Sequence, residues 1–121
     1  MSPYLWVAAA VLGGAGACAR FLLDRSVSSA VGGRLPLGTM AVNLSGAFLL
    51  GLVVGVEGGK DWELLAGTAL LGAFTTFSTW FFESHRLAEQ GNLWPAVLNL
   101  VISLLLGLGL FKVGRLLGGM V

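Results

Sequence analysis

Hydroxyl and aromatic side chains crowd the middle of one long apolar stretch, GTALLGAFTTFSTWFFES, which runs from Gly67 to Ser84. The cluster follows Gly72 and consists of Thr75, Thr76, Phe77, Ser78 and Thr79. A simple membrane span would not place this many polar groups in a row. Backbone that is broken at membrane depth persists only where protein or a water-filled cavity satisfies its polar groups. The stretch therefore predicts a helix broken in mid-membrane, which in transporters and channels exposes carbonyl and amide groups to ions.

The residues after the predicted break fall on two faces of a helix. The polar face consists of Thr76, Thr79 and Glu83. The mostly aromatic face consists of Phe77, Trp80, Phe81 and Ser84. The polar face could conduct a hydrated or hydrogen-bonded species, although Glu83 lies near the end of the span and could instead reach the interface. An aromatic face usually packs in a core, but ring edges carry positive quadrupole charge and could solvate a small anion if they turned inward.

Two other apolar segments carry polar residues at helical spacing. The first has Thr39, Asn43 and Gly46, and the second has Asn99, Ser103 and Gly107. Buried polar groups are costly in lipid and tend to mark pathways. The Asn43 amide can donate two hydrogen bonds, so it could serve such a pathway or join helices through an interhelical hydrogen bond. Arg20 could snorkel to the headgroups or create a positive vestibule.

The composition is that of an integral membrane protein. Of the 121 residues, 56% are hydrophobic and 11% are charged, whereas a soluble domain carries about 25% charged residues. The net charge of +1 argues against a nucleic-acid partner. No pair of a nucleophile and a base and no cluster of metal ligands is visible, so an enzyme is not expected. The single cysteine, Cys18, cannot form an intrachain disulfide and is expected to be a small buried hydrophobe.

Four apolar segments are long enough to span a membrane as helices, which takes about 20 residues each. They cover roughly residues 4–23, 37–56, 62–84 and 93–116. The sequence therefore predicts an all-α membrane protein with a single domain over residues 1–121 and four transmembrane helices. A loop over residues 24–35 and a polar link over 85–92 are expected between them, with His85 exposed in the link. The first segment is predicted to be a span, because no convincing signal-peptide cleavage site follows it.

The positive charges give the predicted spans no clear orientation. Lys60, Lys112 and Arg115 lie on the side of the termini. The other side has Arg25, Arg34 and Arg86, or four residues if Arg20 is counted. Because the positive-inside rule needs an imbalance, the chain is expected to insert in both orientations. Four short helices hardly enclose a pore alone, so we expect an antiparallel homodimer.

Glycine is abundant, with 19 residues concentrated in the predicted spans. The residues at close-packing positions are Gly51 and Gly55, Gly114 and Gly118, and Gly13, Gly14 and Gly16. Small residues at this kind of spacing let helices approach closely in a membrane. Tight helix packing is the expected role of most of them.

Three motifs stand out in the first three spans. They are Gly13-Gly-Ala-Gly-Ala-Cys-Ala-Arg20-Phe21, Gly38-Thr-x-x-Val-Asn43-x-x-Gly46-x-Phe48-x-x-Gly51 and Gly72-x-x-Thr75-Thr-Phe77-Ser-Thr79. In combination they resemble the motifs of the Fluc/CrcB family of fluoride channels, closely over spans one to three and loosely over span four. Two positions depart from the family. Trp80 stands where the family has a second Phe, and Asn99 stands where it often has Tyr.

The resemblance implies a fluoride-selective channel that exports fluoride passively down its electrochemical gradient and lowers cytoplasmic fluoride. It implies an antiparallel, dual-topology dimer in the plasma membrane, the bacterial inner membrane, with two pores lined by both subunits. The partner would be a second copy or, if another subunit supplies the missing rings, a paralogue. A structural Na⁺ would lie at the dimer centre, held by the backbone carbonyls of Gly72 and Thr75.

The resemblance also implies roles for residues along the anion pore. Asn43 would be the pore asparagine of span two. The family has two pore phenylalanines three residues apart, called the Phe box. Phe77 would be the first and would turn its ring edge toward the anion, and Trp80 would stand at the position of the second. The remaining pore residues would be Arg20, Thr39, Thr76, Thr79, Glu83 and Ser103.

Two other function classes account for part of the sequence. A small multidrug exporter has four short helices, but it needs a membrane-buried carboxylate in its first span, and residues 4–23 contain none. A structural subunit that transports nothing would explain the glycine spacing. It would not explain Asn43 together with the threonine-rich break.

Overall fold

The computed structural model describes residues 2–31 and 36–121, and the elements in these ranges are helical. In chain order they are α1 (Pro3–Val31), α2 (Leu37–Val56), α3 (Lys60–Trp62), η1 (Glu63–Leu71), α4 (Gly72–Phe74), α5 (Ser78–Glu89) and α6 (Leu93–Gly118). The segment η1 is π-helical. We call the stretch Lys60–Glu89, which contains α3, η1, α4 and α5, the third span.

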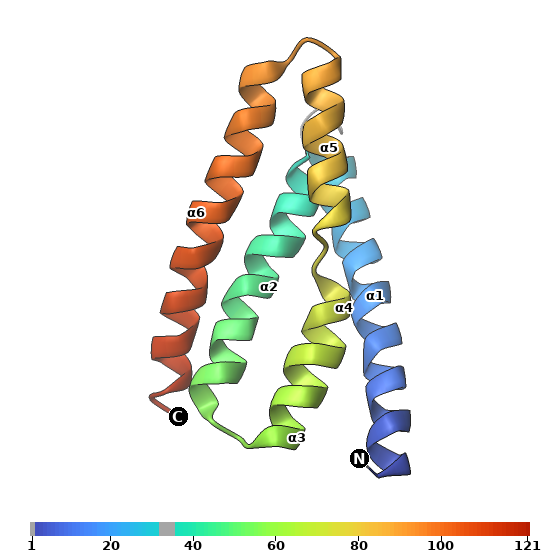
Figure 1. Cartoon of the computed structure of the whole chain (residues 1–121), viewed down its shortest axis with the longest axis vertical. Helices are drawn as coiled ribbons and strands as arrows, with labels where there is room; N and C mark the ends of the chain where they lie inside the picture. Colours follow the sequence, from blue (N-terminus) through green and yellow to red (C-terminus); the bar gives the residue numbers. More distant parts are fainter. Residues whose placement is uncertain (1, 32–35) are drawn as a thin grey trace.

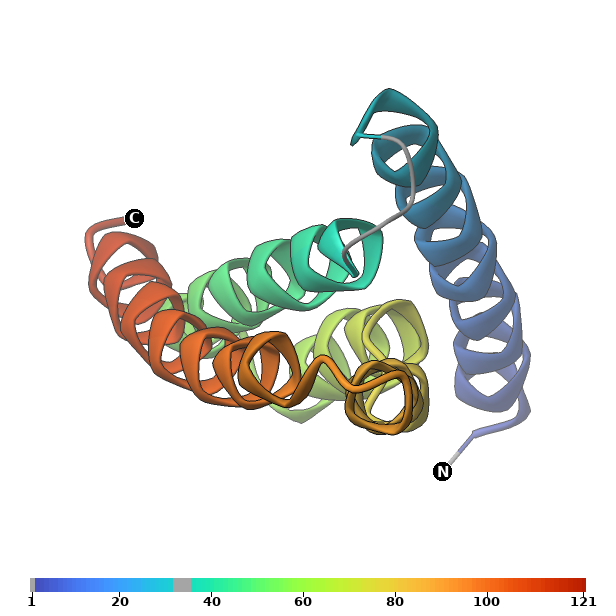
Figure 2. The ribbon, with the colours of Figure 1, turned by 90° about the horizontal axis from the view of Figure 1, so that it is seen from above.

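Four segments are long and apolar enough to cross a membrane, namely α1, α2, the third span and α6. This confirms the predicted all-α protein with four transmembrane segments. Both termini and the turn between α2 and α3 lie at one end of the bundle, and the turn between α5 and α6 lies at the other (Figure 1). Seen from above, α1 and α6 lie on opposite sides, with α2 and the third span between them (Figure 2).

The first helix is longer than predicted, and the prediction of a loop over all of residues 24–35 is wrong. Helix α1 continues through these polar residues to Val31. Ser28 Oγ donates to Asp24 Oδ1 one turn earlier (3.2 Å). The same turn packs on α2, where a Cβ added to Gly38 would overlap Asp24 Oδ1 and Ser28 Oγ. Of the predicted loop, residues 32–35, including Arg34, lie outside the described ranges.

The predicted link over residues 85–92 is also mostly helical. Helix α5 runs to Glu89, so His85 is a helical residue, and its exposed imidazole contacts the Glu89 carboxylate one turn later. The helix ends at Gly91, whose φ of 83° suits glycine. Asn92 N–H donates back to the carbonyl of Leu87 (2.9 Å), a hydrogen bond typical of helix ends closed by glycine. The true connection between α5 and α6 is therefore very short.

Glycines bring α2 and α6 into close contact, as their spacing predicted. A Cβ added to Gly51 would overlap the carbonyl oxygen of Phe111, and one added to Gly114 would overlap that of Phe48. Gly55 and Gly118 are equally crowded by backbone atoms. In lipid, where apolar side chains gain little by leaving the solvent, such close backbone packing stabilises helix pairs.

Helix α1 packs on the third span along a narrow line. Its only fully buried residue is Gly16, where an added Cβ would overlap the carbonyl oxygen of Leu70. Gly14 faces open space, so its predicted packing role is not seen within one chain. Cys18 is exposed, and the expectation that it is buried is wrong for the single chain. The reason is that only one side of α1 contacts the rest of the bundle.

Candidate functional site

The helical pattern of the third span stops at Phe74 and resumes at Ser78. Thr75 has an extended backbone, with φ of −84° and ψ of 162°. Its N–H and its hydroxyl both donate to the carbonyl of Leu71, at 3.0 and 3.1 Å. These two hydrogen bonds complete the last helical turn at the carbonyl of Leu71, and the chain continues from Thr75 in an extended conformation.

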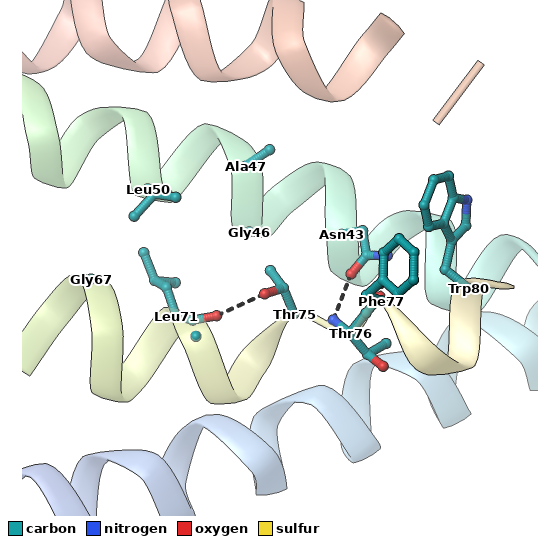
Figure 3. A pocket seen from close by; sticks show the side chains of 11 residues that line it. Asn43, Gly46, Ala47, Leu50, Gly67, Leu71, Thr75, Thr76, Phe77 and Trp80 are labelled. Carbon is teal, nitrogen blue, oxygen red and sulfur yellow. Dashed lines mark hydrogen bonds between the residues drawn. The ribbon is translucent and has the colours of Figure 1, made fainter. Parts of the chain in front are cut away.

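The side chain of Asn43 on α2 joins the two sides of this interruption. Its Nδ2 donates to the carbonyl of Thr76 (2.8 Å), and its Oδ1 accepts the Thr76 N–H (2.9 Å). The second bond is drawn in Figure 3. One side-chain amide thus satisfies both backbone polar groups of Thr76, a residue that has left the helix. Within the part of the chain that the structure describes, the second hydrogen of Nδ2 has no hydrogen-bond acceptor.

Two backbone carbonyls lose their usual helical partners at the interruption. In a continuous helix, the carbonyl of Gly72 would accept the N–H of Thr76, and that of Thr75 would accept the N–H of Thr79. Here Thr76 N–H donates to Asn43 Oδ1, and Thr79 N–H donates to Thr76 Oγ1 (3.2 Å). The carbonyls of Gly72 and Thr75 are therefore available to other donors or to a cation.

An open groove of about 320 Å³ lies between α2 and the third span and contains the interruption. Six of the predicted site residues line it, namely Asn43, Gly72, Thr75, Thr76, Phe77 and Trp80. Figure 3 shows Asn43, Phe77 and Trp80 close together at one end of the groove, with Thr75 and Leu71 further along it. None of the described residues that line it is charged. The groove thus offers amide, hydroxyl and aromatic groups to whatever enters it.

The aromatic residues at this end form a ladder on α5. The rings of Phe77 and Trp80 are 5.4 Å apart at 71°, so an edge meets a face. The rings of Phe77 and Phe81 are 6.1 Å apart and nearly parallel. Phe77 is 70% exposed in the single chain. Within the single chain this ring therefore has few neighbours beside the groove.

Two of the predicted polar residues form a separate pair. Thr39, which is buried, donates from its hydroxyl to Glu83 Oε1. The bond joins α2 to α5 one turn away from Asn43. The prediction left Glu83 between the interface and the pore, and the structure turns its carboxylate toward α2.

Ser103 lies outside the groove, in a buried network between α5 and α6. Its hydroxyl donates to Asn99 Oδ1 (3.4 Å), and Asn99 Nδ2 donates to Ser84 Oγ (2.7 Å). Ser84 Oγ donates in turn to the carbonyl of Trp80 (3.0 Å). The sequence placed Ser84 with the aromatic face and gave no partner to Asn99. The signal for this network was the i, i+4 spacing of Trp80 and Ser84 beside that of Asn99 and Ser103.

The remaining two site residues are not brought to the groove. Arg20 is a partly exposed residue of α1, which does not contribute to the groove lining. Thr79 has an exposed side chain on α5, and only its N–H takes part in the interruption. Within one chain, six of the predicted site residues therefore lie together around the groove, and the side chains of Arg20 and Thr79 lie away from it.

The chain is similar to known proteins over most of its length. The family model described as CrcB-like protein, Camphor Resistance (CrcB), matches residues 7–115. Fluoride-specific ion channel FluC 2 of Mycobacterium bovis is 44% identical over 111 residues, which cover 92% of this chain and 88% of the relative. The protein of the same name from Mycolicibacterium paratuberculosis is 44% identical over 117 residues, covering 97% and 96%. Fluoride-specific ion channel FluC 1 of Leifsonia xyli subsp. xyli is 40% identical over 124 residues, covering 99% and 90%.

These matches extend over nearly the whole chain and over nearly the whole of each relative. They include the interruption of the third span and the asparagine that bridges it, both of which fall within the matched residues 7–115. The resemblance found in the sequence motifs is thereby confirmed, and the chain belongs to the CrcB family.

Proposed function

We propose that this protein is a fluoride-selective channel that lets fluoride leave the cell passively, down its electrochemical gradient, and so lowers cytoplasmic fluoride. Membership of the CrcB family and the similarity to relatives named as fluoride-specific ion channels support this function. The observation that carries it is the bridge from Asn43 to Thr76. This bridge holds the third span open beside a groove lined with hydrogen-bond donors and aromatic rings.

The groove has the chemistry that a small anion needs. Fluoride holds its water strongly, so a pore must replace those hydrogen bonds with donors of its own. Asn43 keeps one amide hydrogen for this purpose, because its other hydrogen donates to Thr76. Phe77 adds ring-edge hydrogens, which carry positive partial charge. No carboxylate among the described residues lines the groove to repel the anion.

The other proposed pore residues extend the path beyond the groove. Thr76 and Thr79 supply hydroxyls beside the interruption, and the pair of Thr39 and Glu83 lies one turn further along α2. The proposed role of Ser103 is that of a hydroxyl on the α6 side of the path. Arg20 is proposed to give positive charge to a vestibule, where it would attract anions before they enter.

We propose that the working unit is an antiparallel dimer of chains inserted in both orientations. The near balance of Lys and Arg between the two ends supports dual insertion. The open groove and the exposed ring of Phe77 support a partner on that face. The proposed partner is a second copy of this chain. A paralogue that supplies a Phe and a Tyr where this chain has Trp80 and Asn99 is the alternative, and a homodimer that conducts alone excludes it.

We propose that the carbonyls of Gly72 and Thr75 from both subunits hold one Na⁺ at the dimer centre. The fit rests on the two carbonyls whose helical N–H donors are directed to Asn43 and Thr76 instead. Oxygen atoms of backbone carbonyls are suitable ligands for alkali ions in channels. A bound Na⁺ supplies positive potential to the anion path and links the two subunits.

The four spans make this a multi-pass membrane protein. We propose that its location is the bacterial inner membrane, since the named relatives are bacterial channels. A fluoride channel in this membrane would provide the path by which fluoride leaves the cytoplasm.

The deciding experiment is fluoride efflux from liposomes that contain only this purified protein. A fluoride electrode should record rapid release once the electrical gradient is relieved, and a chloride electrode should record little release from matched liposomes. Release no faster than from protein-free liposomes would overturn the proposed function. Equal release of fluoride and chloride would overturn the proposed selectivity.

A further inference from the structure

We propose that Ser84 and Asn99 are positioning residues for Trp80. They turn its indole N–H toward α6, so that Trp80 offers the groove an aromatic wall of carbon and hydrogen and no N–H donor. The proposal rests on the proposed function for the meaning of the groove, but its central claim about the indole N–H can be measured without any ion flux.

Trp80 is held at two points, the N–H of its indole and its backbone carbonyl. Its Nε1–H donates to the backbone carbonyl of Asn99 on α6 (3.3 Å). Its own backbone carbonyl accepts the hydroxyl of Ser84 (3.0 Å). Ser84 is held in turn by the Asn99 amide at 2.7 Å, which is the shortest bond of the network. Asn99 therefore reaches Trp80 both through its own carbonyl and through Ser84.

The bond between Ser84 and Asn99 is buried, and the bond from the indole to the Asn99 carbonyl is partly buried. Ser84 is 2% exposed and Asn99 is 5% exposed. Within the described residues, no buried side-chain nitrogen or oxygen atom lacks a hydrogen-bond partner. In such surroundings a hydrogen bond cannot be exchanged for one to water, and breaking it leaves a polar group unsatisfied. The orientation of the indole is thus tied to the packing of α5 on α6.

This orientation decides what Trp80 can do in the groove. An indole has one N–H donor and no acceptor, so the hydrogen that bonds to Asn99 is not free to bond to an anion. Trp80 nevertheless lines the groove and meets Phe77 edge to face. In Figure 3 the nitrogen of Trp80 lies on the far side of the ring from Phe77 and Asn43. The ring carbons are the part of Trp80 that an ion in the groove would meet.

The same contacts link two positions that look unrelated in the sequence. Trp80 and Asn99 are 19 residues apart, and the structure places the indole N–H of one on the carbonyl of the other. The Asn99 amide also supplies the donor that holds Ser84, so positions 80, 84 and 99 share one set of contacts. We therefore expect the effects of substitutions at positions 80 and 84 to be coupled.

The first test is a nuclear magnetic resonance measurement on the indole N–H groups of the ¹⁵N-labelled protein in detergent micelles. Trp80→Phe identifies the Trp80 signal by its loss from the four tryptophan signals. Sodium fluoride should leave this signal unshifted, whereas Ser84→Ala should shift it and speed its exchange with solvent. Sodium chloride at equal ionic strength is the control. A downfield shift of the signal produced by fluoride alone would overturn the proposal, because it would place the N–H on the anion.

The second test is a double-mutant cycle on fluoride efflux from liposomes, with Trp80→Phe, Ser84→Ala and both together. If Ser84 acts only through Trp80, the double variant should be no slower than Trp80→Phe alone. The product of the two single reductions in fluoride efflux would then exceed the reduction measured for the double variant by about threefold or more. If the reduction of efflux in the double variant equals the product of the two single reductions, Ser84 acts independently of Trp80. This result would overturn the proposed positioning role of Ser84. Elution of each variant as the wild-type oligomer controls for folding.

The two tests separate the failure of this proposal from the failure of the proposed function. If the protein conducts no fluoride, the efflux cycle gives no values, but the indole signal and its response to Ser84→Ala still report the contact with Asn99. An indole signal that ignores Ser84→Ala would overturn the positioning role, whether or not fluoride flows.

Discussion

At the scale of single residues, Asn43 combines two roles that the sequence offered as alternatives. One is a structural hydrogen bond between helices, and the other is hydrogen-bond donation to an anion in the pore. A purely structural amide would spend its whole hydrogen-bonding capacity on neighbouring helices, and a pore amide would keep it for the ion. The structure shows that Oδ1 of Asn43 accepts the backbone N–H of Thr76 and that one N–H of Asn43 donates to the backbone carbonyl of Thr76. The remaining N–H lies at the groove. The interhelical bond therefore orients the donor that we propose for the anion.

Asn43→Asp should reduce fluoride efflux by at least about tenfold, which corresponds to about 1.4 kcal/mol of barrier. An ionised Asp can still accept the Thr76 N–H, but it loses both N–H donors and adds a charge that repels the anion. Size-exclusion chromatography should still show the wild-type oligomer, because the side chain at position 43 still accepts the N–H of Thr76. Ser45→Ala is the matched control on α2, since Ser45 bonds only to carbonyls of its own helix.

Normal efflux in Asn43→Asp would remove this residue from the pore. Loss of the oligomer together with normal efflux from what survives would assign Asn43 to structure alone.

Phe77→Ile should also reduce efflux by about tenfold while the protein keeps its fold. The ring is 70% exposed within the chain, so the bundle loses little packing, and Ile retains much of the bulk. What disappears is the quadrupole of the ring and its edge-to-face contact with Trp80, worth about 0.5–1.5 kcal/mol. Phe82→Ile, at a 61% exposed ring on the same helix outside the groove lining, is the control for aromatic content. Equal efflux in the two variants would contradict an anion-facing role for Phe77.

At the scale of helices, the membrane fold depends on backbone contact between α2 and α6. Gly114 sits on the carbonyl of Phe48, and Gly51 sits on that of Phe111, so each helix inserts a glycine against the other. Helix α2 also forms one side of the groove, through Asn43, Gly46, Ala47 and Leu50.

Gly114→Ala should lower the stability of the folded protein in detergent by about 1–3 kcal/mol, the usual cost of overpacking. The added methyl group would overlap the carbonyl oxygen of Phe48, which is backbone and cannot rotate away. Gly14→Ala is the control, since an added Cβ there meets no atom within 4 Å. Thermal unfolding, followed by loss of the oligomer peak after heating, gives the comparison. Equal midpoints for the two variants would show that α2 and α6 do not approach as closely as described.

The helices also show what a sequence can predict in a membrane protein and why the rest escapes it. Long apolar runs give the four spans directly, because lipid admits few alternatives to a helix. The end of α1 escaped prediction because Asp24 and Ser28 satisfy each other within the helix and pack on Gly38. Spacing placed Asn43 on one helical face with Thr39 and Gly46 and left open whether it serves a pathway or joins helices. It could not identify Thr76 as the partner of Asn43, since the two residues are 33 positions apart.

At the scale of the whole molecule, the single chain leaves its proposed site open. The groove between α2 and the third span, the ring of Phe77 and the outward faces of α1 are all uncovered. Some of this apolar surface meets lipid. Lipid cannot cover the carbonyls of Gly72 and Thr75, because hydrocarbon offers no partner for them. Protein or water in the groove must supply those partners, and the proposed second chain would supply protein groups there.

The orientations in which this chain inserts, and with them the proposed antiparallel dimer, can be tested by thiol labelling in intact cells. The native Cys18 is exposed and is first replaced in Cys18→Ala. Lys60→Cys then places a thiol at the end of the bundle that carries both termini, and Gln90→Cys places one at the opposite end (Figure 1). An impermeant maleimide should label only part of each variant in intact cells and the rest after lysis. Dual insertion exposes each end of the bundle on both sides of the membrane, so both variants should behave alike. Full labelling of one variant with full protection of the other would mean a single orientation and would exclude an antiparallel homodimer.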